Sequence, residues 1–166
     1  MSALAIVLRH ADQVLAWGLC ATILMTTILE GSRIAGHSRM SLPFLFGTVF
    51  TANRRDAMIA GYVIYALGGW MFAGFYALLF ATIHRATWWL GGLIGLCHGA
   101  FLCAVLLPLI AYVHPRMATP FDGPSELRML EPPGSFGLNY GWGTPLAVIV
   151  AQTAFGLLLG TALTLH

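Results

Sequence analysis

Four long apolar segments dominate the sequence and limit the folds that it can adopt. They cover Val14–Leu29, Ala57–Thr82, Trp88–Val113 and Pro145–Leu165. Each is long enough to cross the ~30 Å hydrocarbon core of a bilayer. Because lipid offers the main chain no hydrogen-bond partners, each segment is predicted to be an α-helix. The first is the shortest, and it either recruits Leu4–Leu8 or continues as a helix past Glu30.

The composition supports the same fold class. Of the 166 residues, 58% are hydrophobic and only 8% are charged, whereas about a quarter of a soluble domain is charged. We therefore predict an all-α membrane protein in which residues 1–166 form a single transmembrane domain. The net charge is +2 without a basic run, which argues against a nucleic-acid partner. The cysteines lie inside apolar stretches and do not suggest a disulfide framework.

The arginines predict the orientation of the four spans. Six of them fall in the first and third loops: Arg33, Arg39, Arg54, Arg55, Arg116 and Arg128. Only Arg9 and Arg85 fall on the other side. The excess of positive charge in cytoplasmic loops places loops one and three in the cytoplasm and both termini outside.

Two loops have features of their own. Residues 42–50, LPFLFGTVF, are apolar but too short to span, and Pro43 suits the start of a helix, so we expect a short interfacial or shallow re-entrant segment. Residues 115–143 are rich in Gly and Pro and are predicted to form an irregular cytoplasmic cap. The hinge Ile83–Thr87 is short, so the second and third spans should form an antiparallel hairpin.

An octapeptide occurs twice. HSRMSLPF begins at His37 and HPRMATPF begins at His114, and five of the eight positions are identical. The same shift of 77 residues also aligns Gly18 with Gly95. We interpret this match as a duplication with repeat 1 at about 13–82 and repeat 2 at about 88–166. Both octapeptides fall on one side, which predicts two parallel-repeat helical hairpins related by a twofold along the membrane normal.

The octapeptides supply the first candidate site. Arg39 and Arg116 carry planar guanidinium groups suited to phosphate or carboxylate, and His37 and His114 titrate near neutral pH. These residues would bind an anionic ligand or a lipid headgroup. The alternative is topological, with the arginines fixing orientation and Pro-Phe turning the chain along the membrane. A copper site of His and Met is a weaker alternative, so no metal is assigned.

His98 supplies the second candidate site, because it lies near the middle of the third span. An ionisable residue there suggests a ligand, proton or transport pathway. The structural alternative is a neutral imidazole that is hydrogen-bonded to Tyr65 or Gln152 on neighbouring helices. Elsewhere, Glu30 and Arg33 are spaced for a local ion pair. No catalytic motif is present, so neither catalytic residues nor a cofactor are assigned and the chain is not expected to be an enzyme.

Several strings together resemble one family: LPFLFGTVFT, RATWWLGGLIGLCHGAF, HPRMA and LEPPGSFGLNYG. They are similar to a family of uncharacterised bacterial four-helix integral membrane proteins, over roughly residues 38–165. The resemblance implies a helical protein of the bacterial inner membrane and no established activity. It also implies that relatives often carry His at the positions of Tyr65 and Gln152, so this chain keeps His98 without those two.

Three functions follow from these observations as hypotheses. The first is an accessory or structural subunit that packs in a larger membrane complex or binds membrane lipid, with a protein partner or a second copy of itself. The second is a small oligomeric transporter or channel with its pathway at the repeat interface near His98. The third is a haem or redox membrane protein.

Overall fold

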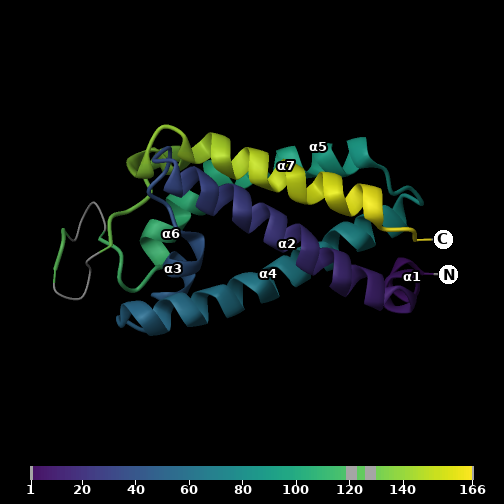
Figure 1. Ribbon diagram of the computed structural model, residues 1–166, viewed down its shortest axis with the longest axis horizontal. Helices are drawn as coiled ribbons and strands as arrows, with labels where there is room; N and C mark the ends of the chain where they lie inside the picture. Colours follow the sequence, from purple (N-terminus) through teal and green to yellow (C-terminus); the bar gives the residue numbers. More distant parts are fainter. Residues whose placement is uncertain (1, 119–122, 126–129, 166) are drawn as a thin grey trace. The chain divides into compact units, whose positions relative to one another are not determined.

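The computed structural model describes residues 2–118, 123–125 and 130–165, and four of its helices are long and apolar enough to cross a membrane. They are α2 (Ala11–Ile34), α4 (Arg54–Thr82), the continuous helix Trp88–Val113, and α7 (Thr144–Ala162) (Figure 1). The prediction of an all-α membrane protein with four spans is confirmed. The first span continues past Glu30, because α1 (Ala3–Arg9) is a separate helix.

The third span changes its helical geometry midway. It begins as α5 (Trp88–Phe101), passes through the π-helix η1 (Leu102–Leu106) and ends as α6 (Leu107–Val113). Pro108 stands at the start of α6. A proline has no N–H for the preceding turn and its ring crowds the carbonyl four residues earlier. The wider turn of a π-helix relieves this conflict without ending the span.

Two shorter helices lie in the connections. α3 (Leu42–Gly47) begins with Pro43 in its first turn, as predicted, and Ser41 is its N-cap residue. The 3-10 segment η2 (Ser135–Tyr140) lies in the predicted cap, just before α7. The hinge Ile83–Thr87 connects α4 to α5, as expected.

The chain divides into two compact units, and each long span contributes to both of them. Unit 1 contains Met1–Ile28, Ala66–Gly99 and Val150–His166. Unit 2 contains Leu29–Tyr65 and Ala100–Ile149. Both chain ends therefore belong to unit 1, where Thr164 donates a hydrogen bond to the side chain of Gln13 (Figure 1).

Small residues let the helices of unit 1 approach backbone to backbone. A Cβ atom added at Gly91 of α5 would stand 2.0 Å from the carbonyl oxygen of Gly156 in α7. One added at Gly95 would stand 2.2 Å from the carbonyl oxygen of Gln152. Figure 1 shows α5 and α7 next to each other. Neither helix has room for a larger side chain here, so the small residues permit the close approach.

The same kind of contact joins α2 to α4. A Cβ atom added at Gly69 would stand 2.0 Å from the hydroxyl oxygen of Thr22, and one added at Gly18 would stand 2.8 Å from the Cβ of Ala73. Gly69 and Gly156 are related by a shift of 87 residues, which continues the repeat after the longer third loop, and Gly18 and Gly95 are related by the shift of 77. Each hairpin of unit 1 therefore uses equivalent glycines for close packing, as a duplication would predict.

We expect Gly91→Ala to destabilise the protein, because the added methyl group meets a main-chain oxygen that cannot move aside. Forcing extra volume into a packed contact costs about 1–3 kcal/mol. SDS-induced unfolding followed by far-UV circular dichroism measures this loss. The control is Gly74→Ala in α4, where an added Cβ has no neighbour within 4 Å. This variant should be neutral or slightly stabilising, and equal effects of the two changes would contradict the packing argument.

Candidate functional site

Helices α3 and α6 pack together in unit 2 and form the base of the candidate site. Leu45 of α3 is buried with Ile110 and Ala111 of α6 and with Met117. On its other side α3 lies against α4, because a Cβ added at Gly47 would overlap the carbonyl group of Ala57. The expected short segment at residues 42–50 is thus a helix whose buried side chains fix it within unit 2.

The second octapeptide binds the C-terminal end of α3. Nε2 of His114 lies 3.0 Å from the carbonyl oxygen of Leu45. The Nη1 atom of Arg116 donates to the carbonyl oxygens of Thr48 at 2.6 Å and Val49 at 3.0 Å. The last carbonyl groups of a helix lack partners within the helix. His114 and Arg116 therefore supply donors where α3 ends.

The surroundings of His114 select its neutral form. Its Nδ1 accepts a hydrogen bond from the main-chain N–H of Arg116 at 3.1 Å, so the proton resides on Nε2, which donates to Leu45. Protonation of Nδ1 would place two N–H groups against each other. Burial lowers the pKa of His114, the nearby positive charge of Arg116 lowers it further, and the bond to Leu45 opposes them.

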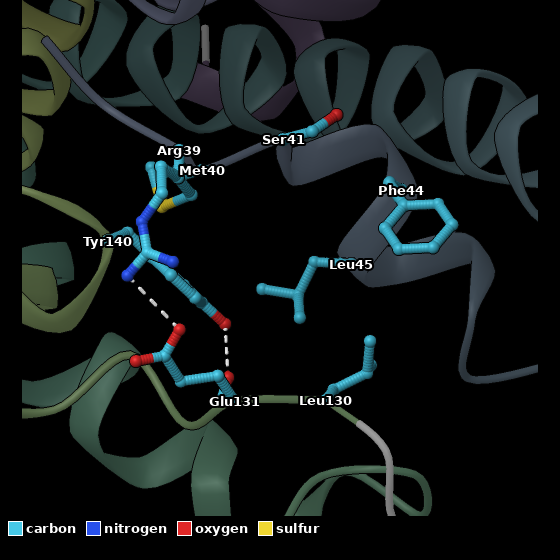
Figure 2. Close-up of a pocket in the computed structure, with 8 residues that line it drawn as sticks. All are labelled: Arg39, Met40, Ser41, Phe44, Leu45, Leu130, Glu131 and Tyr140. Atoms are coloured by element: carbon cyan, nitrogen blue, oxygen red, sulfur yellow. Dashed lines mark hydrogen bonds and ion pairs between the residues drawn. The ribbon is translucent and has the colours of Figure 1, made fainter. Parts of the chain in front are cut away.

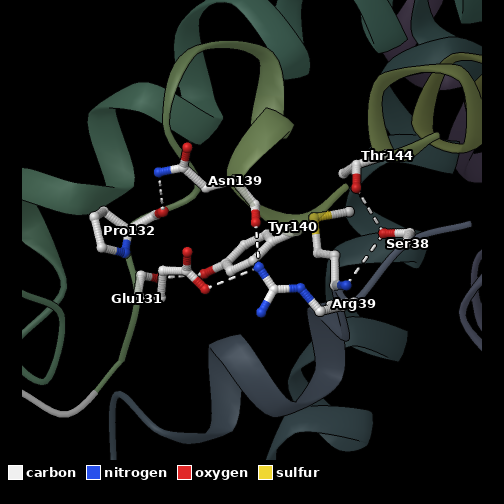
Figure 3. Close-up of polar contacts among 8 residues, drawn as sticks. Ser38, Arg39, Glu131, Pro132, Asn139, Tyr140 and Thr144 are labelled. Carbon is white, nitrogen blue, oxygen red and sulfur yellow. Dashed lines mark hydrogen bonds and ion pairs between the residues drawn. The ribbon is translucent and has the colours of Figure 1, made fainter. Parts of the chain in front are cut away.

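The first octapeptide binds the cap segment that precedes α7 (Figure 3). The main-chain N–H of Arg39 donates to the carbonyl oxygen of Tyr140 at 2.6 Å, and its Nη2 donates to that of Asn139. Ser38 and Thr144, which are both buried, share a hydrogen bond of 2.7 Å between their hydroxyl groups. His37 is exposed and its ring meets that of Trp142 edge to face at 6.1 Å.

The two octapeptides therefore exchange partners. Arg39 and His37 of the first contact the segment that follows the second, between residues 131 and 144. Arg116 and His114 of the second contact the segment that follows the first, between residues 45 and 49. A twofold relation between duplicated halves would produce this exchange, and the repeat itself stays a prediction.

A pocket of about 210 Å³ lies beside the first octapeptide (Figure 2). The side chains that line it fall into an apolar group and a polar group. The apolar group is Met40, Phe44, Leu45 and Leu130, and the polar group is Arg39, Ser41, Glu131 and Tyr140. Met40 and Leu45 are each only 5% exposed, so the apolar wall continues into the core of unit 2.

The polar group is organised around Glu131. Its Oε2 atom lies 3.2 Å from Nη2 of Arg39, and Tyr140 donates its hydroxyl proton to the main-chain oxygen of Glu131 at 2.6 Å. Burial raises the pKa of Tyr140 to about 12, and the charge of Glu131 adds to this shift while Arg39 opposes it. Tyr140 thus stays protonated and acts as a donor at neutral pH. Its bond fixes the main chain from which the Glu131 carboxylate extends.

His98 belongs to α5 in unit 1, and its side chain packs against α4. Its Nδ1 atom is 3.3 Å from the hydroxyl oxygen of Tyr76, and its ring centroid is 4.5 Å from that of Phe72. The expected partners were Tyr65 or Gln152, and the structure corrects this to Tyr76. Counting outward from the hinge indicates only the ring neighbour, because Phe72 and His98 are equally far from Arg85, and Tyr76 lies one helical turn from Phe72.

Gln152 also belongs to unit 1, and it is 6% exposed. Its Oε1 atom and the Nε2 atom of His98 are buried without a hydrogen-bond partner among the described residues. Gln152 belongs to α7, and its main chain packs against α5 at Gly95. Tyr65 belongs to unit 2, where its ring packs at 6.3 Å from that of Phe46.

The structure brings together some of the residues that the sequence analysis selected. Glu30 and Arg33 form the predicted ion pair at 2.6 Å. Within residues 2–118, 123–125 and 130–165, no group of three His, Cys, Asp or Glu side chains could hold a metal ion. Glu131 and Tyr140 were not predicted, because Glu131 pairs with Arg39, which is distant in sequence, and the hydroxyl group of Tyr140 binds a main-chain oxygen. Arg128 and the end of the second octapeptide, Thr119–Phe121, lie outside the described residues.

We expect the protein to lose stability as the pH falls below 6.5. The pKa of His114 is lowered in the folded state from its ordinary value of 6.5, so in this range the unfolded chain binds more protons than the folded one. One such group changes the free energy of unfolding by at most about 1.4 kcal/mol per pH unit. Thermal unfolding of the wild type and of His114→Gln at pH 7.5 and 5.0 tests this.

The His114→Gln variant cannot titrate at this position, so its midpoint temperature should change less with pH. His37→Gln is the matched control, because it makes the same replacement at an exposed histidine away from the end of α3. A pH dependence that His114→Gln does not alter would contradict the assignment.

No protein-family model, curated protein or solved structure matches the chain. The resemblance to bacterial four-helix membrane proteins therefore stays a prediction. The features that bear on function are the membrane-spanning helices, the pocket at Arg39 and the buried polar atoms at His98.

Proposed function

We propose that this chain is a multi-pass protein of the bacterial inner membrane that holds a membrane lipid in the pocket at Arg39 and serves as an accessory subunit without catalysis of its own. The observation that carries the proposal is the composition of this pocket, in which Arg39 stands at the edge of a wall of buried and half-buried apolar side chains. A phospholipid has the matching order of parts, an anionic phosphate followed by acyl chains.

The size of the pocket favours a lipid over a soluble metabolite. Pockets for drug-sized ligands usually measure about 300–1,000 Å³ and enclose most of the ligand. This pocket measures about 210 Å³, which suffices for only part of such a molecule. A lipid needs no more, because the rest of its acyl chains stays in the bilayer.

Arg39 has the capacity to bind a phosphate group. Its side chain is 68% exposed and, within the described part of the chain, its side-chain contacts all use Nη2, which leaves Nε and Nη1 without a partner there. A guanidinium group binds phosphate through two parallel N–H groups. Arg116 differs, because its Nη1 atom is already bound to two carbonyl oxygens at the end of α3.

The proposed orientation supports the same ligand. The excess of arginine in loops one and three favours a cytoplasmic position for these loops and an outer position for both termini. Arg39 follows closely after α2 ends at Ile34, so it would stand near the headgroups of the inner leaflet. Basic pockets at this level are suited to lipid headgroups.

The proposed partner is a larger membrane complex or a second copy of the chain. The glycines at positions 91, 95, 156 and 160 are occupied by contacts between α5 and α7. They therefore cannot serve as the docking face for another helix. Blue-native electrophoresis after extraction in mild detergent would reveal a partner, and a protein that runs alone as a monomer would contradict an accessory role.

We expect Arg39→Gln to lose most of the phospholipid that the wild type retains through purification. Hydrogen bonds to charged groups contribute about 1.5–3 kcal/mol each. Their loss should weaken lipid binding roughly tenfold to a hundredfold. Native mass spectrometry of the protein released from mild detergent counts the bound lipid directly.

The control for this experiment is Arg55→Gln. Arg55 is exposed in the first turn of α4 and does not line the pocket, so its replacement removes the same charge elsewhere. Equal lipid retention by Arg39→Gln and the wild type would refute the proposed site. Equal loss in both variants would show a general effect of charge instead.

The second candidate function, a small oligomeric transporter or channel, is favoured by the buried polar atoms of unit 1. The Nε2 atom of His98 and Oε1 of Gln152 lie within spans, and burying unpaired polar atoms is unfavourable. A hydrogen-bonding species that passes beside these two atoms would satisfy both. Tyr76 would hold the other side of the imidazole ring.

If this second candidate is right, we expect His98→Ala to reduce flux through liposomes that contain the purified protein. Protons, metal ions and small anions are tested separately. The control is His84→Asn in the hinge, where φ is +52° and asparagine tolerates that conformation. Flux that His98→Ala leaves unchanged would exclude His98 from the pathway.

A further inference from the structure

The pocket at Arg39 carries opposite charges side by side. The guanidinium group of Arg39 and the carboxylate of Glu131 both line it, with Nη2 and Oε2 3.2 Å apart (Figure 2). We infer that the pocket selects a zwitterionic lipid with a primary ammonium group, such as phosphatidylethanolamine. This inference rests on the proposed lipid site. Its phosphate binds Arg39 and its ammonium binds Glu131.

Glu131 is held in a position that suits this role. Tyr140 donates to its main-chain oxygen, and the side-chain amide of Asn139 donates to the main-chain oxygen of the next residue, Pro132, at 3.0 Å (Figure 3). These bonds fix the backbone and do not use the carboxylate, whose Oε2 atom pairs with Arg39. Its side chain is 49% exposed, and Oε1 has no partner in the part of the chain that the structure describes.

The contact between Arg39 and Glu131 does not prevent lipid binding. Exposed ion pairs contribute little stability, because solvent screens them and two flexible side chains must be ordered. A zwitterionic headgroup replaces one ion pair by two, since each of its charges meets the opposite charge on the protein. The site therefore stays neutral when it is filled.

Other headgroups fit the charges less well. Phosphatidylglycerol brings a phosphate without a cation, so the carboxylate of Glu131 would repel it or remain unpaired beside it. Phosphatidylcholine brings a quaternary ammonium group that has no N–H to donate to Glu131, whereas a primary ammonium group has three donors. We therefore expect a preference for the ethanolamine headgroup over both.

The test is competition between lipids with identical acyl chains. The full-length protein in mild detergent is mixed with equal amounts of phosphatidylethanolamine, phosphatidylglycerol and phosphatidylcholine, and native mass spectrometry measures which lipids it retains. We expect the wild type to retain several times more of the ethanolamine lipid than of the glycerol lipid. Glu131→Gln should bring this ratio close to one.

The control is Asp56→Asn, which removes an exposed carboxylate outside the pocket and should keep the ratio of the wild type. A wild type that retains the three lipids equally, while Arg39→Gln loses them all, would overturn the selectivity but leave the lipid site intact. If Arg39→Gln retains every lipid, the proposed function itself fails. Displacement of all three lipids by inorganic phosphate at equal molarity would also overturn the selectivity, since free phosphate has no ammonium group.

Discussion

The last main-chain carbonyl groups of a helix have no partners within the helix and need hydrogen-bond donors from elsewhere. The structure of unit 2 depends on the residues that supply these donors. α3 packs against α4 on one side and α6 on the other. His114 and Arg116 supply donors to Leu45, Thr48 and Val49. Arg39 supplies the corresponding donors to the cap segment before α7. Through these bonds, short segments that cannot form spans are held in a defined place in unit 2.

This arrangement assigns different tasks to two arginines that are equivalent in the repeated octapeptide. Arg116 uses Nη1 for two carbonyl oxygens, and its backbone N–H binds His114. Arg39 binds the cap mainly through its backbone and Nη2 and remains largely exposed. Arg39 stands beside the pocket and has a carboxylate partner there, Glu131. The proposed lipid site therefore arises where one copy of the repeat has donors left over.

Much of the fold was predictable because lipid limits the choices. The lengths of the four apolar segments, the start of α3 at Pro43 and the pairing of Glu30 with Arg33 followed from local rules. The partner of His98 did not, and it is Tyr76 instead of Tyr65 or Gln152. Both Tyr76 and Gln152 lie in apolar helices, where composition does not reveal which residues face each other. That choice depends on the rotation of each helix about its axis, which the glycine contacts fix.

The sequence by itself determined that the chain forms four membrane-spanning helices, because a chain with so few charged residues has to place most of its surface in lipid. It also singled out His37, Arg39, His114 and Arg116 through their repetition. Only the tertiary structure decided what each of them contacts. Their partners are mostly main-chain oxygens. Because every residue carries such an oxygen, the sequence does not indicate which one a given side chain will contact. Glu131 and the apolar wall beside it became part of a site only when the cap segment folded against α3.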